Sequence, residues 1–316
     1  MTDVITSDTI ASVSLNDADR DPDGFARELG ESFVDYGFAI VRDHGIPQEL
    51  IDRAEAKAKE YFALPDAVKQ QYVIPGGGGA RGHTPFGIET AKGAKAHDLK
   101  EFWHVGRELP AGHPFRNVMA DNVWPSEVPG FKETFLELYD TFDRTGVKVL
   151  RAIARFLKVD EDYFTDTVRD GNSVMRMLHY PPQTEATGEH IRAGAHEDIN
   201  TITLLLGAEE AGLELNTKDG RWIPVSPKKG ELVINIGDML QRLTNGRLRS
   251  TSHRVVNPTP DRASKARYSM PFFLHFRPDF MIEALPGTVP EGEEPKWPPI
   301  SSHDYLQERL REIKLK

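Results

Sequence analysis

The sequence contains no cysteine, and this absence excludes several kinds of chemistry at once. Without thiols the chain forms no disulfide bond, no thiolate metal site and no cysteine nucleophile. No uninterrupted apolar run approaches the roughly 18 residues of a membrane-spanning helix, so we expect no membrane partner. Residues 1–8 have neither a basic start nor a long apolar core, so no signal peptide is predicted. These absences favour a cytoplasmic protein.

Basic residues are outnumbered by acidic ones. The 316 residues include 39 Lys and Arg against 49 Asp and Glu, which gives a net charge of −10. A negative protein is repelled by phosphate backbones, so we expect no nucleic-acid partner. The length is ample for a large core and corresponds to roughly two domains, although single β-barrel domains commonly reach about 200 to 250 residues.

One stretch has the pattern of a metal-binding corner that leads into a buried strand. His196-Glu197-Asp198 runs directly into the apolar, β-branched segment 199–206. On an extended chain, side chains two residues apart point the same way, so His196 and Asp198 share one face. The pattern turns Glu197 to the other face, where we expect it to contact solvent or outer polar groups. One imidazole and one carboxylate therefore converge.

A third ligand and a carboxylate-binding pair follow downstream. His253 completes a set of two histidines and one carboxylate, which leaves open metal positions and suits non-haem Fe(II) oxygenases. Zinc uses similar ligands, so these three residues alone leave the metal undecided. On a predicted strand, Arg267 and Ser269 share a face and offer a guanidinium fork and a hydroxyl to one carboxylate. A metal site beside such a clamp indicates an acidic co-substrate.

These motifs, in this order, resemble the Fe(II)- and 2-oxoglutarate-dependent dioxygenases of the isopenicillin N synthase-like branch. The resemblance covers nearly the whole chain and rests on His196-x-Asp198, His253, Arg267-x-Ser269, Gly237–Thr251, Tyr180-Pro181-Pro182 and Asp35–Ile46. It implies a mixed α and β fold, with a double-stranded β-helix (jelly roll) core, an N-terminal helical region and a long supporting helix.

The resemblance also implies a function. Fe(II) is expected on His196, Asp198 and His253, with no catalytic side chain beyond these ligands. The co-substrate 2-oxoglutarate is expected on Arg267 and Ser269, with Tyr180 as a further hydroxyl. Leu178 stands where many relatives carry an asparagine that serves the metal-binding end of 2-oxoglutarate. The expected reaction uses O2 to convert 2-oxoglutarate to succinate and CO2 while a small-molecule substrate is hydroxylated or otherwise oxidised.

Other functions remain open at this point. Some bacterial relatives fragment 2-oxoglutarate to ethylene, and isopenicillin N synthase uses the same clamp for its substrate and consumes no 2-oxoglutarate. A hydrolytic zinc enzyme is disfavoured, because nothing near the three ligands resembles a dedicated general base. A jelly roll without catalytic activity, acting as a binding module, is the alternative from a different class.

The remaining patterns divide the chain into three parts. Residues 1–120 are predicted as the N-terminal helical region, 121–280 as the jelly-roll core with its supporting helix, and 281–316 as a connection and closing helix. Predicted helices are a segment that Asp21 begins and Gly37 ends, one or two helices in 46–72, a long helix over 131–157 and a helix over 302–313. Predicted strands are 38–41, 98–105, 174–180, 202–206, 213–215, 222–225, 232–236 and 268–276. Asp219-Gly220 and Asn245-Gly246 are predicted as hairpin-type turns.

A glycine run, Gly76–Gly79, invites comparison with a phosphate-binding loop. The Gly-Lys-Ser/Thr ending of such a loop is missing, so a flexible connection is predicted instead. By the family resemblance it lies near the mouth of the active site, where Arg81 and Phe86 meet substrate. Histidines outside the ligand set, His104 and His275 among them, are predicted to be structural.

Overall fold

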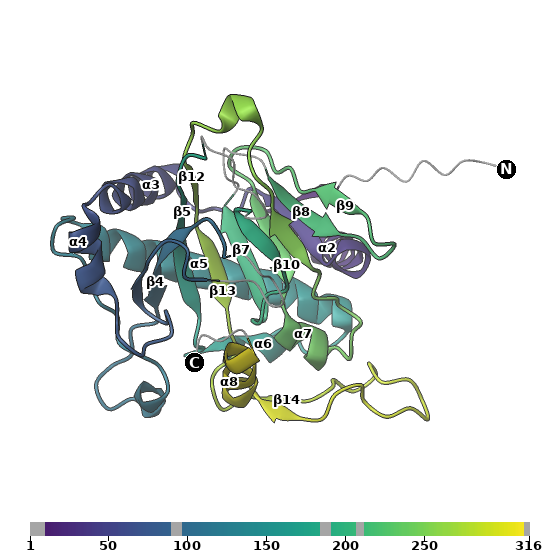
Figure 1. Ribbon diagram of the computed structural model, residues 1–316. Helices are drawn as coiled ribbons and strands as arrows, with labels where there is room; N and C mark the ends of the chain where they lie inside the picture. The colour runs from purple at the N-terminus through teal and green to yellow at the C-terminus, as the bar shows by residue number, and fades with distance from the viewer. Residues whose placement is uncertain (1–9, 90–96, 184–190, 207–211, 313–316) are drawn as a thin grey trace.

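Two β-sheets form the centre of the protein, and helices cover one side of them (Figure 1). The structure is a computed structural model that describes residues 10–89, 97–183, 191–206 and 212–312. The helices are α1 Asp17–Arg20, α2 Pro22–Tyr36, α3 Gln48–Phe62, α4 Asp66–Lys69, α5 Phe131–Leu157, α6 Tyr163–Val168, α7 Asp238–Leu243 and α8 Ser302–Glu312. The strands are β1 Ser12–Ser14, β2 Phe38–Arg42, β3 Gly82–Thr84, β4 Glu101–Gly106, β5 Val174–Tyr180, β6 Ala193–His196, β7 Ile202–Leu206, β8 Leu213–Asn216, β9 Trp222–Pro224, β10 Leu232–Ile236, β11 His253–Val255, β12 Arg267–Ser269, β13 Pro271–Leu274, β14 Met281–Ile282 and β15 Ile300–Ser301.

The two larger sheets make the jelly roll that the sequence predicted. One has the strand order β1-β2-β10-β7-β13-β5-β4-β3, with β12 also paired to β5, and the other has the order β6-β11-β8-β9. Apart from the parallel pair β1 and β2, the paired strands run antiparallel. A shared apolar cluster, which includes Phe38, Val233, Leu215 and Val255, contains residues of both sheets. Residues from distant parts of the chain are thereby held in two facing layers.

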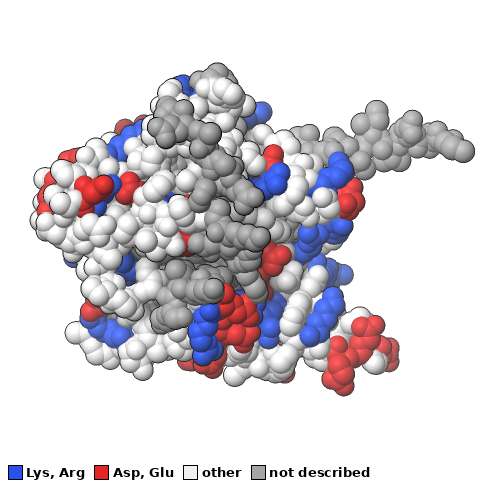
Figure 2. Space-filling model, in the orientation of Figure 1, with Lys and Arg blue, Asp and Glu red and all other residues white. Residues whose placement is uncertain are grey.

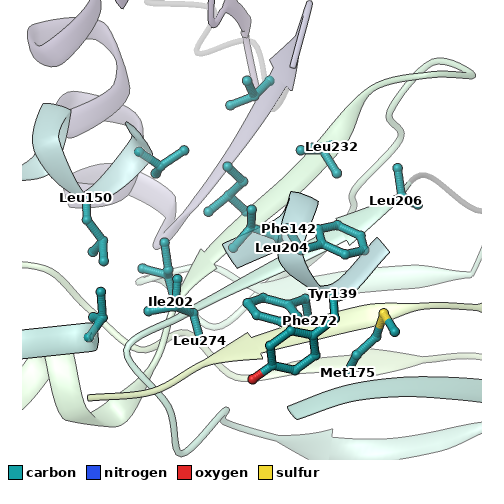
Figure 3. Close-up of a cluster of buried hydrophobic side chains, with 14 of the residues drawn as sticks. Tyr139, Phe142, Leu150, Met175, Ile202, Leu204, Leu206, Leu232, Phe272 and Leu274 are labelled. Carbon is teal, nitrogen blue, oxygen red and sulfur yellow. The ribbon is translucent and has the colours of Figure 1, made fainter. Parts of the chain in front are cut away.

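The long helix α5 supports the larger sheet from its other face. It begins and ends where its apolar spacing predicted, and its buried side is continuous over 27 residues. Figure 3 shows Phe142 of α5 against Phe272 of β13, with ring centroids 5.5 Å apart and nearly parallel planes. At Gly146 an added Cβ would lie 2.3 Å from a methyl group of Leu274, so any larger residue would require the Leu274 side chain to move.

The N-terminal region is tied to the same sheet. Helix α2 begins as predicted, because Asp21 accepts a hydrogen bond from the backbone N–H of Gly24, and Gly37 ends it with φ 71°. Strand β2 follows at once and pairs with β10. The domain boundaries near residues 120 and 280 stay predictions.

Two expectations about local structure were wrong. Asp219-Gly220 does turn between β8 and β9, but Asn245-Gly246 ends helix α7 instead of joining two strands. Both residues take positive φ, 50° and 82°, a conformation that terminates a helix as readily as it makes a hairpin. The single strand predicted for 268–276 is two strands, β12 and β13, that meet at Met270.

The surface carries both signs of charge. On the face in Figure 2, lysines and arginines are interspersed with acidic side chains over the described residues. None of the described helices combines the length and apolar character that crossing a membrane requires.

Candidate active site

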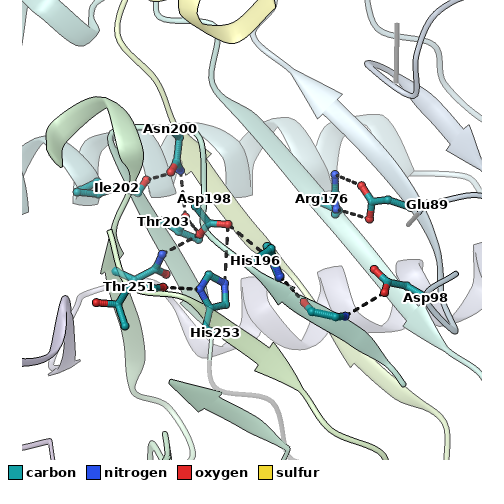
Figure 4. Close-up of polar contacts among 12 residues, drawn as sticks. Glu89, Asp98, Arg176, His196, Asp198, Asn200, Ile202, Thr203, Thr251 and His253 are labelled. Atoms are coloured by element: carbon teal, nitrogen blue, oxygen red, sulfur yellow. Dashed lines mark hydrogen bonds and ion pairs between the residues drawn. The ribbon is translucent and has the colours of Figure 1, made fainter. Parts of the chain in front are cut away.

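Two side chains from the smaller sheet and one from the turn that leads to the larger sheet converge as the sequence predicted (Figure 4). His196 ends β6, His253 begins β11, and the two residues face each other in the antiparallel register of these strands. Asp198 follows His196 in the turn that leads to β7. One ligand atom from each of the three lies within 4.8 Å of the others, and no other such cluster occurs among the described residues.

In both histidine rings, Nε2 is the nitrogen that points towards Asp198. Nδ1 of His196 donates to the carbonyl of Gly194 at 2.7 Å, and Nδ1 of His253 lies 3.1 Å from the carbonyl of Thr251. Their Nε2 atoms lie 3.9 and 3.8 Å from Oδ1 of Asp198. Nδ1–H bonds to carbonyls fix the tautomer in which Nε2 carries a lone pair, the arrangement typical of metal-ligating histidines.

Two hydrogen bonds hold the carboxylate oxygen of Asp198 that does not face the histidines. Its Oδ2 accepts from Oγ1 of Thr203 at 2.5 Å and from Nδ2 of Asn235 at 2.7 Å, while Oδ1 faces the imidazoles. Asn200 in turn donates to Oγ1 of Thr203 at 3.0 Å. Thr203 and Asn235 lie opposite each other on β7 and β10, so the sheet itself positions the carboxylate. No pattern in the sequence pointed to these anchors, because their partners are set by strand pairing.

The electrostatics fit a divalent cation. Burial and the neighbouring His253 lower the pKa of His196 to about 4, so its imidazole is neutral at pH 7. Burial alone would raise the pKa of Asp198, but the two imidazoles, Asn235 and Thr203 together bring it below the usual value. Within the described chain, no lysine or arginine pairs with this buried carboxylate. Two imidazoles and one such carboxylate are the ligand set of non-haem Fe(II).

The predicted carboxylate clamp also comes together. In the register of β12 and β5, Arg267 faces Tyr180 and Ser269 faces Leu178. All four residues are buried, and the guanidinium carbon of Arg267 lies 5.0 Å from the centre of the Tyr180 ring. A second guanidinium, that of Arg192, lies 5.9 Å from the same ring. Guanidinium and hydroxyl donors beside each other suit the distal carboxylate of a keto acid.

A cavity of about 640 Å³ opens beside His196 and Asp198. Its wall includes the glycine-rich segment 76–81, Phe273 of β13, and one side of α8. His104 and His275, which the sequence pattern treated as structural, also line it, whereas exposed Phe86 is not among the described lining residues. The size is that of a site for a small molecule.

One wall of this cavity is a network of charged side chains. Glu89 accepts from both terminal nitrogens of Arg176 at 3.2 and 3.3 Å and lies 2.6 Å from Nζ of Lys100. Nε of Arg176 donates to Nε2 of His104 at 2.6 Å. Burial and the guanidinium of Arg176 lower the pKa of His104 well below its usual value, so that it accepts this bond as a neutral ring. The wall is therefore polar.

Comparison with known proteins assigns two family models to the chain. Residues 9–127 match the non-haem dioxygenase in morphine synthesis N-terminal family, and residues 171–276 match the 2OG-Fe(II) oxygenase superfamily. A 2-oxoglutarate-Fe(II) type oxidoreductase of Emericella nidulans is 36% identical over 291 residues, covering 89% of this chain and 82% of its own.

Solved structures agree with these matches. A putative 2OG-Fe(II) oxygenase family protein from Caulobacter crescentus is 55% identical, with a TM-score of 0.90 over 96% of this chain and 99% of that one. A full-length Neurospora crassa protein, solved in complex with alpha-KG and thymine, is 29% identical, with a TM-score of 0.86 over 96% of each chain.

Proposed function

Because this chain belongs to the 2OG-Fe(II) oxygenase superfamily, we propose that it oxidises a small polar molecule held in the cavity beside His196 and Asp198. The protein is an Fe(II)- and 2-oxoglutarate-dependent dioxygenase, as its relatives are. The observation that carries the assignment of the site is the convergence of His196, Asp198 and His253 within 4.8 Å.

Each part of the site has a distinct task in this proposal. His196 and His253 offer their Nε2 atoms and Asp198 offers Oδ1 to Fe(II), while Thr203 and Asn235 keep the carboxylate from rotating. When bound, Fe(II) and 2-oxoglutarate supply the oxidising chemistry, in which O2 is consumed, 2-oxoglutarate yields succinate and CO2, and the substrate is oxidised. The remaining side chains bind, orient and exclude water.

The co-substrate is assigned to the buried clamp. Arg267 forms a fork for the distal carboxylate, Ser269 adds a hydroxyl from the same face of β12, and Tyr180 adds its phenol from the neighbouring strand β5. Hydrogen bonds to a charged group contribute roughly 1.5 to 3 kcal/mol each, so the clamp can supply much of the affinity. Leu178, opposite Ser269, offers no polar contact.

The polar character of the substrate is supported by the wall of the cavity and by one structural neighbour. Glu89, Lys100 and Arg176 place charged groups along one wall of the cavity, where they offer hydrogen-bonding partners to a polar molecule. The Neurospora crassa neighbour holds thymine together with alpha-KG. Thymine is therefore a sensible first compound in a substrate panel.

The test is product analysis of the Fe(II)-loaded enzyme with 2-oxoglutarate and a panel of small polar molecules, thymine included. We expect succinate formation and O2 consumption that a true substrate stimulates and couples to an oxidised product. Ethylene among the gases would indicate fragmentation of 2-oxoglutarate. Consumption of O2 without any need for 2-oxoglutarate would indicate an oxidase that uses another electron source. No consumption under any condition would favour a binding module.

A further inference from the structure

A short chain of hydrogen bonds connects the cavity wall to the proposed metal site. Asp98, which lies just before β4 and is 5% exposed, accepts a hydrogen bond from the backbone N–H of Gly194 at 2.9 Å. The carbonyl of the same residue, Gly194, accepts from Nδ1 of His196 at 2.7 Å. Figure 4 shows this chain from Asp98 to His196. Asp98 thus holds the backbone that sets the orientation of the imidazole.

Asp98 is itself fixed by a buried cation. Its second oxygen, Oδ2, accepts from Nζ of Lys100 at 2.8 Å, and Lys100 also lies 2.6 Å from Oε2 of Glu89. Glu89 in turn binds Arg176 on the cavity wall. Both oxygens of Asp98 therefore accept bonds, one from the charged wall and one from the backbone beside the proposed metal ligand.

We propose that Asp98 is a positioning residue, which orients His196 for metal binding through the Gly194 backbone and links that orientation to the charged wall of the substrate cavity. This inference rests on the proposed function, because it takes His196 as a ligand. The direct bond from His196 goes to a main-chain carbonyl, which no side-chain substitution removes. Asp98 is the side chain through which the orientation can be altered.

The substitution Asp98→Asn would break the chain of bonds. Asp98 faces two donors, the Gly194 N–H and the Lys100 ammonium, and an amide has only one acceptor oxygen. The bond to the ammonium is charge-assisted and stronger, so the amide oxygen will face Lys100 and its NH2 group will face the Gly194 N–H. Two donors then oppose each other, and the Gly194 backbone shifts. Substitution of groups that orient a metal-ligating histidine changes metal affinity by about 10- to 100-fold.

Glu101 provides a matched control. It is also 5% exposed, lies three residues further along the chain and accepts from two donors, Nζ of Lys69 and Nδ1 of His179, each at 2.8 Å. Among the described residues, neither of these bonds leads to Gly194 or His196. Glu101→Gln therefore removes a comparable buried charge and the same number of acceptors without altering the His196 backbone.

The experiment compares wild type, Asp98→Asn and Glu101→Gln by anaerobic Fe(II) titration and by the visible absorption band that forms when 2-oxoglutarate is added. We expect both variants to melt at lower temperature, but only Asp98→Asn to bind Fe(II) about tenfold more weakly and to shift the band. Equal Fe(II) affinity and an unshifted band in Asp98→Asn and Glu101→Gln would overturn the proposal.

Two further readouts keep the test decisive. In the wild type we expect slow hydrogen exchange at the Gly194 amide, because Asp98 accepts its hydrogen bond, and fast exchange there would contradict the proposal even if Asp98→Asn did not fold. If the wild type itself fails to bind Fe(II) or to form the band, the proposed metal site is wrong. If only the difference between the two variants is missing, the proposed function stands and the positioning role does not.

Discussion

Two clusters in this protein contain the same residue types, two histidines around one buried carboxylate, but we infer different roles for them. In the first, Oδ1 of Asp198 faces Nε2 of His196 and of His253 at 3.9 and 3.8 Å. In the second, Oε1 of Glu101 pairs with Nδ1 of His179 at 2.8 Å, and Oε2 lies 3.6 Å from Nε2 of His83. The second cluster lies where β3, β4 and β5 run side by side.

The difference between the clusters is a lysine. Nζ of Lys69 lies 2.8 Å from Oε2 of Glu101, so the buried carboxylate of the second cluster has its counter-charge within the protein. Asp198 meets two imidazoles and, among the described residues, no lysine or arginine. A buried carboxylate is costly unless it is paired, and at Asp198 we propose that a metal ion supplies the counter-charge. Residue composition alone therefore does not identify a metal site, whereas the source of the counter-charge does.

Removing the carboxylate of the first cluster should have the largest effect. Asp198→Ala deletes the charged ligand, and we expect Fe(II) affinity and 2-oxoglutarate turnover to fall by at least about 100-fold. Substitution of a residue that only hydrogen-bonds to a metal ligand already lowers metal affinity by about 10- to 100-fold. Succinate formation and anaerobic iron titration measure this. Glu197→Ala, which removes the neighbouring carboxylate, is the control and should retain Fe(II) affinity. If Asp198→Ala remained active, the first cluster would not be the metal site, and it would not differ from the second cluster in this respect.

Removing the lysine of the second cluster should affect stability instead. Lys69→Met leaves Glu101 buried without its cation, and breaking such a pair costs about 3 to 5 kcal/mol of the free energy of unfolding. Denaturant unfolding measures the loss. Iron binding by the folded variant should match that of the wild type, and a selective loss of iron affinity would show that the two clusters are not independent.

Acid should destabilise the second cluster through His83. Burial is the main cause that lowers the pKa of His83 to about 4, so the folded protein resists a proton that the unfolded chain accepts near pH 6.5. The contribution to stability is present above pH 6.5 and is lost as the pH falls from 6.5 towards 4. It amounts to at most about 3.5 kcal/mol, since the pKa falls from 6.5 to about 4 and one pKa unit corresponds to about 1.4 kcal/mol. His83→Gln should weaken the pH dependence of unfolding over this range, and an unchanged slope would contradict this assignment.

The smallest expected effect concerns the carboxylate clamp. Arg267→Lys keeps the charge but replaces the fork with a point donor, so we expect the KM for 2-oxoglutarate to rise about tenfold, the equivalent of one charge-assisted hydrogen bond. Affinity for Fe(II) alone should not change. Steady-state kinetics against 2-oxoglutarate concentration measure the rise, and an unaltered KM would show that Arg267 does not bind the co-substrate.

The sequence was most informative where chemistry and periodicity are local. His196 and Asp198 share a face because they are two residues apart, and the apolar spacing of 131–157 predicted the bounds of α5. The jelly roll was predicted largely from the resemblance to a family with these ordered motifs. Asn245-Gly246 was predicted correctly as a turn, but the element that it ends was not. The residues that follow a helix and the central residues of a tight hairpin both adopt positive φ, so the sequence pattern is the same.

The rest depends on pairing between segments far apart in the chain. Asn235 reaches Asp198, and Asp98 reaches Gly194, only because particular strands and turns lie side by side. Glu89 and Arg176 meet across the cavity wall for the same reason. Such partners leave no periodic trace in the sequence, so a single sequence identified the ligands but neither the groups that orient them nor the charged wall.

The most direct test of this account is the anaerobic visible spectrum of the Fe(II)-loaded protein before and after addition of 2-oxoglutarate. We predict a new charge-transfer band in the wild type that is absent in Asp198→Ala and unchanged in Lys69→Met. This result would place metal and co-substrate together at the first cluster. Bound iron that gives no band with 2-oxoglutarate would contradict the assignment and would mean that the clamp holds a different carboxylate.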